Sequence, residues 1–382
     1  SVTYAKGFSM ENDAMTEQEL EKALRTAAEA DVAVIFAGLP EIFESEGYDR
    51  TSMKLPQCQD RLIEEVLKVQ PNVVVVLHNG SPVELPWADK VSAILEMYLG
   101  GQGVGEACDR LLYGEANPSG RLAETFPYRL EDNPSYLHFP GNGKRVLYGE
   151  DIFVGYRYYD TKKVLVRYAF GHGLSYTEFA YGDLNLSSAQ MTDEDILTVS
   201  LKVKNTGQTE GKEVVQLYVA DLCGTPERAV KELKGFAKVH LLPGEEKTVS
   251  MEISARDLSY YEERLGDWYA PSGTYRILIG HASDDIRLHA DIVFKTKKKL
   301  PLRVDFTTTF GELLDHTKTA PVITELLAPL AAAAASAEGM SDEYKKLGEQ
   351  VIREMPLKSL MGQMPGEQVE QLIGQLNCLL AQ

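Results

Sequence analysis

Apolar positions in roughly the first 115 residues alternate between two patterns. Residues 31–38 and Val73–His78 form nearly continuous apolar runs, which are typical of parallel strands buried on both faces. Before the first run and again between the two runs, apolar residues recur at helical spacing, first after a capping-box signature at Thr16 and Glu19 and then after Pro56. This alternation of strand and helix predicts a parallel sheet with helices on both faces.

Residues 115–177 lose this rhythm and are rich in Pro, Gly and Tyr. We interpret them as a long segment that wraps around and closes the first domain. We expect a strand near residues 154–159, because a structureless loop of such length would be unusual. From about residue 179 the period of apolar positions changes to two, over 197–204, 214–219, 247–253 and 275–279. This period predicts a β-sandwich of roughly 100 residues.

Beyond the three lysines at 297–299 the pattern becomes helical again. Thr309 and Glu312 form a second capping-box signature, residues 331–335 are a run of alanines, and residues 369–380 carry an amphipathic face. The predicted architecture is therefore an α/β sandwich domain over 1–178, an all-β sandwich over 179–298 and a small helical C-terminal tail over 299–382.

Composition excludes some classes of partner. The chain of 382 residues is 44% hydrophobic and 25% charged, as in ordinary globular proteins. Its formal charge of −18 argues against nucleic acid and anionic membranes, because binding to either needs a basic surface. No apolar run reaches the length of about 18 residues that a membrane span requires.

The four cysteines are scattered without the spacing of a metal site, which predicts reduced thiols; they are Cys58, Cys108, Cys223 and Cys378. No metal and no organic cofactor is predicted. The chain begins at Ser1 without Met and without a signal-like region, so we expect it to be a piece or a processed product of a longer protein. Its compartment is not fixed by any motif, although a bacterial cytoplasm is the preferred prediction.

Candidate chemistry gathers in the loop that follows the first apolar run, over residues 44–50. Three carboxylates, an arginine and a tyrosine lie within these seven residues. In open α/β sheets the loops at the carboxyl ends of parallel strands hold ligands. Crowding can raise the pKa of one acid, as a general acid requires, while the arginine keeps another ionised. On chemistry alone, a solvated acidic loop without catalytic function is the simpler interpretation.

The motif Ser45-Glu46-Gly47-Tyr48-Asp49-Arg50, followed by Leu55-Pro56, resembles the acid/base loop of family 3 glycoside hydrolases of the β-glucosidase type. Further motifs of that family follow in its order and spacing; they are His-Asn-Gly-Ser-Pro-Val at 78–83, Gly-Gly-Gln at 100–102, Asn-Pro-Ser-Gly-Arg-Leu at 117–122 and Phe-Gly-His-Gly-Leu-Ser-Tyr-Thr at 170–177. The resemblance covers nearly the whole chain. It implies that the all-β sandwich is a fibronectin type III-like domain.

A retaining glycosidase of this kind needs two carboxyl groups about 5 Å apart, one as nucleophile and one as general acid/base. The resemblance implies that Glu46 is the acid/base, with Glu44 as the second choice. In the family the nucleophile is an aspartate on a separate N-terminal (β/α)8 barrel. No such barrel and no nucleophile motif is recognisable in this sequence, and the opening strand expected upstream of Val2 is not recognisable either.

Neighbouring loop residues have supporting roles in this interpretation. We expect Asp49 and Arg50 to form a carboxylate–guanidinium contact that holds the loop. Phe43 and Tyr48 either stack on the departing sugar or serve as ordinary packing residues.

The resemblance implies a longer parent enzyme that hydrolyses terminal β-glucosides or short cello-oligosaccharides. Without the barrel, this chain alone is expected to be inactive. Two alternatives stay open: a related β-xylosidase or arabinofuranosidase, and a non-catalytic carbohydrate-binding or assembly module. Oligomeric state is also open, with a homo-oligomer among the outcomes.

Overall fold

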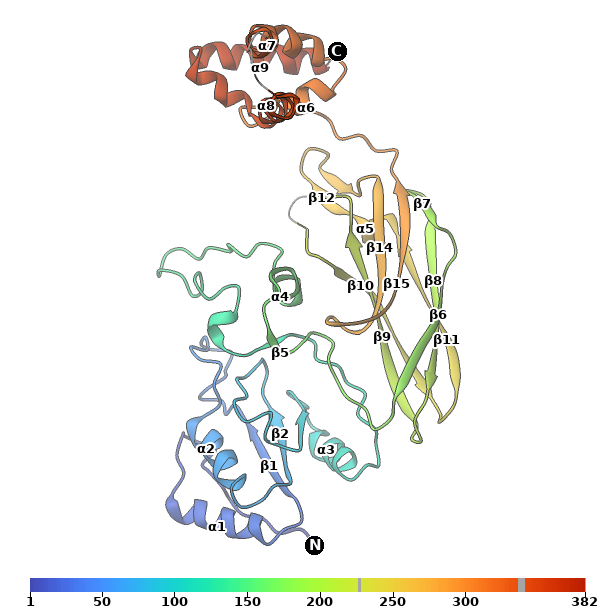
Figure 1. The fold of residues 1–382 in the computed structure, drawn as a ribbon. Helices are drawn as coiled ribbons and strands as arrows, with labels where there is room; N and C mark the ends of the chain where they lie inside the picture. The colour runs from blue at the N-terminus through green and yellow to red at the C-terminus, as the bar shows by residue number, and fades with distance from the viewer. Residues whose placement is uncertain (226–227, 336–340, 382) are drawn as a thin grey trace. The chain divides into compact units, whose positions relative to one another are not determined.

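The computed structural model describes residues 1–225, 228–335 and 341–381 (Figure 1). The chain divides into two compact units. The first comprises Ser1–Ser259 and Ala270–Lys297, and the second comprises Tyr260–Tyr269 and Lys298–Gln382.

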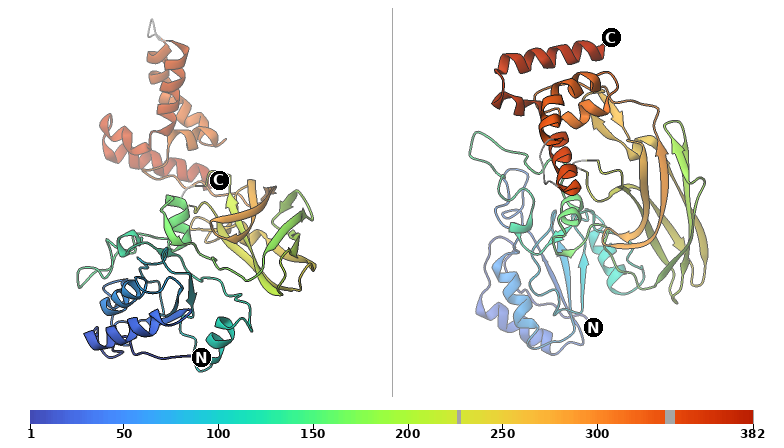
Figure 2. Two further views of the ribbon diagram at one scale, coloured as in Figure 1. Left: turned by 60° about the horizontal axis from the view of Figure 1, so that its bottom comes forward. Right: turned by 45° about the horizontal axis from the view of Figure 1, so that its top comes forward.

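The first unit opens with a three-stranded parallel sheet in the order β1-β2-β3. The sheet and its helices are β1 (Ala33–Gly38), β2 (Val73–His78), β3 (Ala93–Glu96), α1 (Glu17–Ala28), α2 (Gln57–Val66) and α3 (Val104–Leu112). Helices α1 and α2 lie on one side of the sheet and α3 lies on the other (Figures 1 and 2). The predicted α/β sandwich with helices on both faces is confirmed.

Local signals in the sequence explain where these elements begin and how they pack. The Thr16 hydroxyl accepts a hydrogen bond from the Glu19 amide at 3.2 Å, and the Glu19 carboxylate accepts one from the Thr16 amide at 2.9 Å, which completes the capping box of α1. In the core, Trp87 is fully buried and its indole donates to the Asp60 carboxylate at 2.8 Å. Burial raises the pKa of Asp60 to about 6.

The burial predicted for the two apolar runs is found in β2 but not in β1. Strand β2 is buried along most of its length, as predicted. The expectation that residues 31–38 are buried on both faces is wrong, because Val34 and Phe36 are 40% and 52% exposed. Strand β1 lies at the edge of the sheet, where only the face of Ile35 and Ala37 enters the core.

The segment over residues 115–177 contains little regular structure: β4 (Phe126–Pro127), η1 (Leu130–Asp132), α4 (Tyr156–Lys162) and β5 (Val166–Tyr168), with β4 pairing with β5. The strand predicted near residues 154–159 is wrong, since this region forms helix α4. Tyr156 and Tyr159 are three residues apart and both are buried, as expected for one face of a helix. Lys163 ends the helix in a left-handed conformation.

Two sheets packed face to face form the remainder of the first unit, which confirms the predicted β-sandwich. One sheet has the order β10-β9-β14-β15-β7 and the other β11-β8-β6. The strands are β6 (Phe179–Leu186), β7 (Gln190–Thr192), β8 (Ile196–Asn205), β9 (Gly211–Asp221), β10 (Glu232–Leu241), β11 (Glu246–Ser254), β14 (Gly273–Ala282) and β15 (Asp285–Lys295), with the short helix α5 (Ala255–Leu258) after β11. Val199, Leu217 and Ile277 are fully buried between the sheets.

The second unit combines a short hairpin with a group of helices, and it contains the predicted helical tail. Its elements are β12 (Tyr260–Glu262), β13 (Asp267–Tyr269), α6 (Phe310–Asp315), α7 (Ala320–Ala335), α8 (Asp342–Glu354), η2 (Leu357–Gly362) and α9 (Gly366–Ala381). Thr309 caps α6 with both halves of the capping box. Phe310, Leu313 and Val369 are buried in its core. Among the helices described, none has the length and apolar character to cross a membrane.

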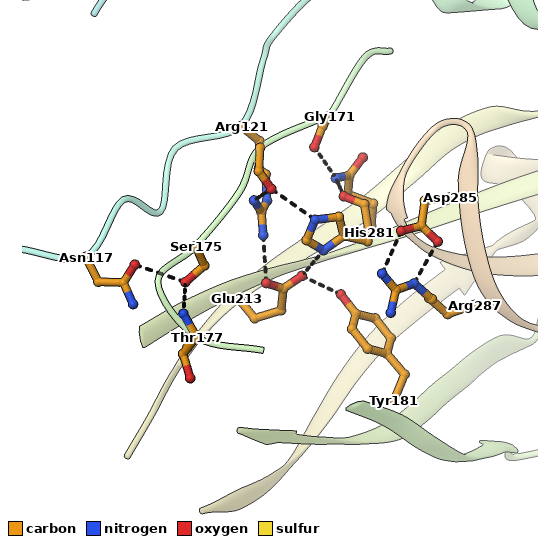
Figure 3. Close-up of polar contacts among 12 residues, drawn as sticks. Asn117, Arg121, Gly171, Ser175, Thr177, Tyr181, Glu213, His281, Asp285 and Arg287 are labelled. Carbon is orange, nitrogen blue, oxygen red and sulfur yellow. Dashed lines mark hydrogen bonds and ion pairs between the residues drawn. The ribbon is translucent and has the colours of Figure 1, made fainter. Parts of the chain in front are cut away.

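Within the first unit, a buried carboxylate joins the segment over residues 115–177 to the sandwich (Figure 3). Glu213 on β9 is fully buried and accepts hydrogen bonds from Arg121 Nη2 at 2.6 Å and from Tyr181 Oη at 2.6 Å. Its other neighbour is His281 on β14, whose Nδ1 lies 2.7 Å from the carboxylate. We call Glu213, Arg121, Tyr181 and His281 the Glu213 junction.

The environment of the junction keeps Glu213 ionised. Burial alone would raise its pKa, but the hydrogen bond from His281, the charge of Arg121 and the Tyr181 hydroxyl outweigh burial and hold the pKa below its usual value. Arg121 also donates to the carbonyl oxygen of Gly173, and His281 Nε2 lies 3.0 Å from the same oxygen. One carbonyl of the 115–177 segment is therefore fixed by two residues of the junction.

Substitution of Glu213 tests whether the Glu213 junction stabilises the first unit. Glu213→Gln is expected to destabilise the first unit by about 3 kcal/mol, because the Arg121 guanidinium, 7% exposed, then lacks its counter-charge. Calorimetry at pH 7 should show a melting temperature lower by several degrees. The pKa of Glu213 is lower in the folded than in the unfolded chain. The ionised carboxylate therefore stabilises the folded state above the ordinary carboxyl pKa, and this stabilisation is lost on acidification. Glu252→Gln, at an exposed position of β11, is the matched control; equal melting of the two variants would contradict the assignment.

Candidate functional site

The loop predicted to hold the general acid forms a tight turn beyond the end of β1. Ser45 and Tyr48 pair as an isolated antiparallel bridge, so Glu46 and Gly47 form the tip between them. Glu46 is exposed, and in the described part of the chain it makes no hydrogen bond or ion pair. A Cβ atom at Gly47 would have no neighbour within 4 Å. The structure therefore presents the Glu46 carboxylate outward on an open turn.

Glu44, the second choice for the acid, has a different environment. Its carboxylate accepts hydrogen bonds from the Gly80 amide at 2.6 Å and from the Ser81 hydroxyl at 2.7 Å. It also faces Arg50 Nη1 at 3.5 Å. Both oxygens are thus used to attach the loop to the turn that follows β2. These contacts make Glu44 a residue that holds the loop in place.

Arg50 lies at the base of the loop, where it contacts the same turn. Its Nη1 donates to the Ser81 hydroxyl at 2.6 Å and to the Pro82 carbonyl at 3.3 Å. The expected carboxylate partner of Arg50 was Asp49, but the ion pair in the structure is with Glu44. Asp49 is exposed and makes no ion pair within the described ranges. Burial lowers the pKa of Arg50, although the charges of Glu44 and Glu124 oppose this effect.

The two aromatic residues of the loop differ in exposure. Tyr48 is 48% exposed, and its hydroxyl donates to the Glu41 carbonyl, so one edge of the ring is anchored and the rest is accessible. Phe43 is partly buried. Whether either ring stacks on a sugar stays a prediction.

Sequence reasoning missed two carboxyl groups at this edge of the sheet, Glu96 and Glu124. Glu96 ends β3 and accepts hydrogen bonds from the Tyr98 amide at 2.8 Å and from Asn79 Nδ2 at 3.2 Å. Burial raises its pKa to about 7, with help from the charges of Glu124 and Glu44 and against the effect of the two hydrogen bonds. A glutamate near the end of an apolar run that follows two parallel strands is a signal that could have identified it.

Glu124 comes from the 115–177 segment and interacts electrostatically with Arg50. Burial raises its pKa first, the charge of Glu44 raises it further, and Arg50 lowers it. The base of the loop thus brings Glu44 and Glu124 close to Arg50, and Glu96 close to these two carboxyl groups. No group of three or more His, Cys, Asp or Glu side chains is placed to hold a metal ion in the part of the chain that the structure describes.

Comparison with family models gives two matches. The glycosyl hydrolase family 3 C-terminal domain matches residues 2–176, and the fibronectin type III-like domain matches residues 213–283. The first match contains the loop over residues 44–50, and the second contains Glu213 and His281.

Comparison with known proteins gives relatives that are longer than this chain. The thermostable β-glucosidase B of Acetivibrio thermocellus is 46% identical over 381 residues, which are 99% of this chain and 50% of the relative. A β-glucosidase of Kluyveromyces marxianus is 45% identical over 286 residues, which are 74% of this chain and 33% of the relative. The chain therefore spans between a third and a half of the length of these curated relatives.

Solved structures agree with the fold. A β-glucosidase of Bifidobacterium adolescentis superimposes with a TM-score of 0.78 at 38% identity, over 85% of this chain and 48% of that structure. The Kluyveromyces marxianus β-glucosidase in complex with glucose superimposes with a TM-score of 0.69 at 42% identity, over 73% of this chain and 33% of that structure.

The raised pKa of Glu96 predicts a pH dependence of stability. Between the ordinary glutamate pKa and about 7, the folded chain holds a proton that the unfolded chain releases, so stability falls as pH rises through this window. The effect amounts to at most about 3 kcal/mol. Glu96→Gln should flatten the dependence of the unfolding midpoint on pH between about 4.5 and 8. Glu106→Gln on exposed α3 should leave it unchanged; a flat profile in the unmodified chain would contradict the assignment.

Proposed function

Because this chain belongs to glycoside hydrolase family 3, with that family's C-terminal domain followed by a fibronectin type III-like domain, we propose that it carries the general acid/base of a β-glucosidase. The substrates would be terminal β-glucosides. The names of the relatives support this choice, as does the glucose bound in the Kluyveromyces marxianus structure. None of the relatives and structures compared above is named as a β-xylosidase, an arabinofuranosidase or a non-catalytic module.

The observation that carries the proposal is the contrast between Glu46 and Glu44. A general acid must bring its carboxyl group within hydrogen-bonding distance of the departing oxygen. Glu46 lies at the exposed tip of its turn, free of contacts with the described residues, whereas Glu44 is held by Gly80 and Ser81. Only the first arrangement leaves a carboxyl group accessible to a substrate.

In the proposed reaction, Glu46 donates a proton to the glycosidic oxygen while a second carboxylate attacks the anomeric carbon and forms a covalent glycosyl intermediate. Glu46 then removes a proton from the water that hydrolyses this intermediate. Glu44 and Arg50 position the turn by attaching its base to Ser81. We propose that the nucleophile comes from outside the matched region, since the relatives are two to three times longer than the part that this chain matches.

Substitution of the acid should separate two kinds of substrate. In the active enzyme that contains this chain, Glu46→Ala should lower kcat/KM on alkyl glucosides by about 10²–10⁴, because these leaving groups need protonation. Activated aryl glucosides leave without it, so their loss should be much smaller, and added azide should yield glucosyl azide. Glu44→Ala is the matched control and should lower both rates together. An equal loss on both substrates for Glu46→Ala would exclude Glu46 as the acid.

The isolated chain gives a second test. One carboxyl group cannot complete a retaining mechanism, so the 382-residue polypeptide should show negligible hydrolysis of an aryl glucoside in a chromogenic assay. Turnover by this polypeptide that disappears in Glu46→Ala would show that it holds its own nucleophile.

A further inference from the structure

The turn over residues 79–81 connects the carboxyl ends of all three parallel strands, and its buried residue is Asn79. Asn79 directly follows β2 and is 0% exposed. Its Nδ2 donates to the Ser81 carbonyl oxygen at 3.0 Å and to Glu96 Oε2 at 3.2 Å. An amide nitrogen carries two hydrogens, so both are used. One hydrogen bond fixes the shape of the turn, and the other attaches the turn to the end of β3.

The Glu96 carboxyl group is itself held by the chain that follows β3. Its Oε1 accepts a hydrogen bond from the Tyr98 amide at 2.8 Å. Tyr98 has a left-handed backbone with a φ of +48°, which is uncommon for a residue other than glycine. Asn79 is therefore bonded to a carboxyl group whose position is fixed by the local backbone.

The other side of the turn binds the loop that carries Glu46. The Ser81 hydroxyl donates to the Glu44 carboxylate at 2.7 Å and accepts a hydrogen bond from Arg50 at 2.6 Å. The Gly80 amide donates to Glu44 at 2.6 Å, and a Cβ atom at Gly80 would lie 3.1 Å from that carboxyl group. Glycine thus permits this close approach. The turn is the element through which the end of β3 is connected to the base of the loop.

The fold alone gains little from an asparagine at position 79. Asn79 Oδ1 is buried and has no hydrogen-bond partner among the described residues. An unsatisfied buried acceptor offsets much of what two hydrogen bonds contribute to stability. These observations favour a role in placing the turn over a role in general stability.

We propose that Asn79 is a positioning residue for Glu46, acting through the turn over residues 79–81. This turn holds Glu44 and Arg50 at the base of the loop, and the fixed base keeps the tip in one place. A general acid is effective only within hydrogen-bonding distance of the departing oxygen, so a displacement of about 1 Å is costly. The inference rests on the proposed acid/base function of Glu46.

Hydrogen–deuterium exchange in the 382-residue chain tests the link between Asn79 and the loop. Asn79→Ala should raise the exchange rate of residues 40–50 about tenfold, because the loop then opens more often, and it should leave α1 unchanged. Asn72→Ala is the matched control, since Asn72 precedes β2 and its Nδ2 donates to the Asp31 carbonyl at 3.3 Å. Exchange of the loop that stays the same in Asn79→Ala would overturn the proposal.

A double-mutant cycle in the active enzyme that contains this chain tests the link to the chemistry. Asn79→Ala should lower kcat on an alkyl glucoside about tenfold with KM nearly unchanged. In the Glu46→Ala background it should cause no further loss, because no acid is left to position. A merely structural role would lower the rate by the same factor in both backgrounds, and that result would also overturn the proposal.

Two provisions keep the outcomes distinct. If Asn79→Ala does not fold, Ser81→Ala takes its place in both experiments, because it removes the hydroxyl that Glu44 and Arg50 share. An equal loss on alkyl and aryl glucosides for Glu46→Ala would remove the acid/base assignment. The exchange measurement would then still decide whether Asn79 holds the loop.

Discussion

The first unit depends on the burial of one carboxylate, that of Glu213. A buried charge is tolerated only when its partners satisfy it, and these partners come from three separate parts of the chain: Arg121, Tyr181 and His281. The α/β part and the sandwich therefore share one electrostatic site, to which the 115–177 segment contributes the guanidinium. Loss of Arg121 would leave the buried Glu213 carboxylate without its counter-charge.

This junction explains the positions of two sequence motifs that carry no catalytic group. Asn117 accepts hydrogen bonds from the Ser175 hydroxyl and the Tyr176 amide, and it donates to the Glu210 carbonyl on the side of the sandwich. Gly171 has a φ of +82°, and a side chain there would collide with Gln216. The motifs at 117–122 and 170–177 thus hold both ends of the wrapping segment, and the stretch directly after the first motif places Glu124 at the base of the loop near Arg50.

How much of this could be predicted from sequence depends on how local each signal is. Strands β2, β8 and β9 and the caps at Thr16 and Thr309 follow from patterns within a few residues, and all were predicted. Helix α4 was missed, although Tyr156 and Tyr159 have helical spacing. The sequence predicts Asp49 as the partner of Arg50, whereas the structure pairs Arg50 with Glu44, because both side chains also bind Ser81, which is 31 residues from Arg50 in sequence. The protonation of Glu96 depends on burial and on charges that only the fold brings together.

The arrangement around Arg50 separates the residues that hold the loop from Glu46, for which we propose the chemistry. Glu44 uses both oxygens to bind the turn after β2, and Arg50 binds the same turn through Ser81. Glu44 and Glu124 lie near Arg50, and Glu96 lies near both of these carboxyl groups; burial, helped by their mutual repulsion, raises the pKa values of Glu96 and Glu124. Because the base of the loop is fixed in this way, the tip can leave Glu46 without contacts and still hold it in a defined place.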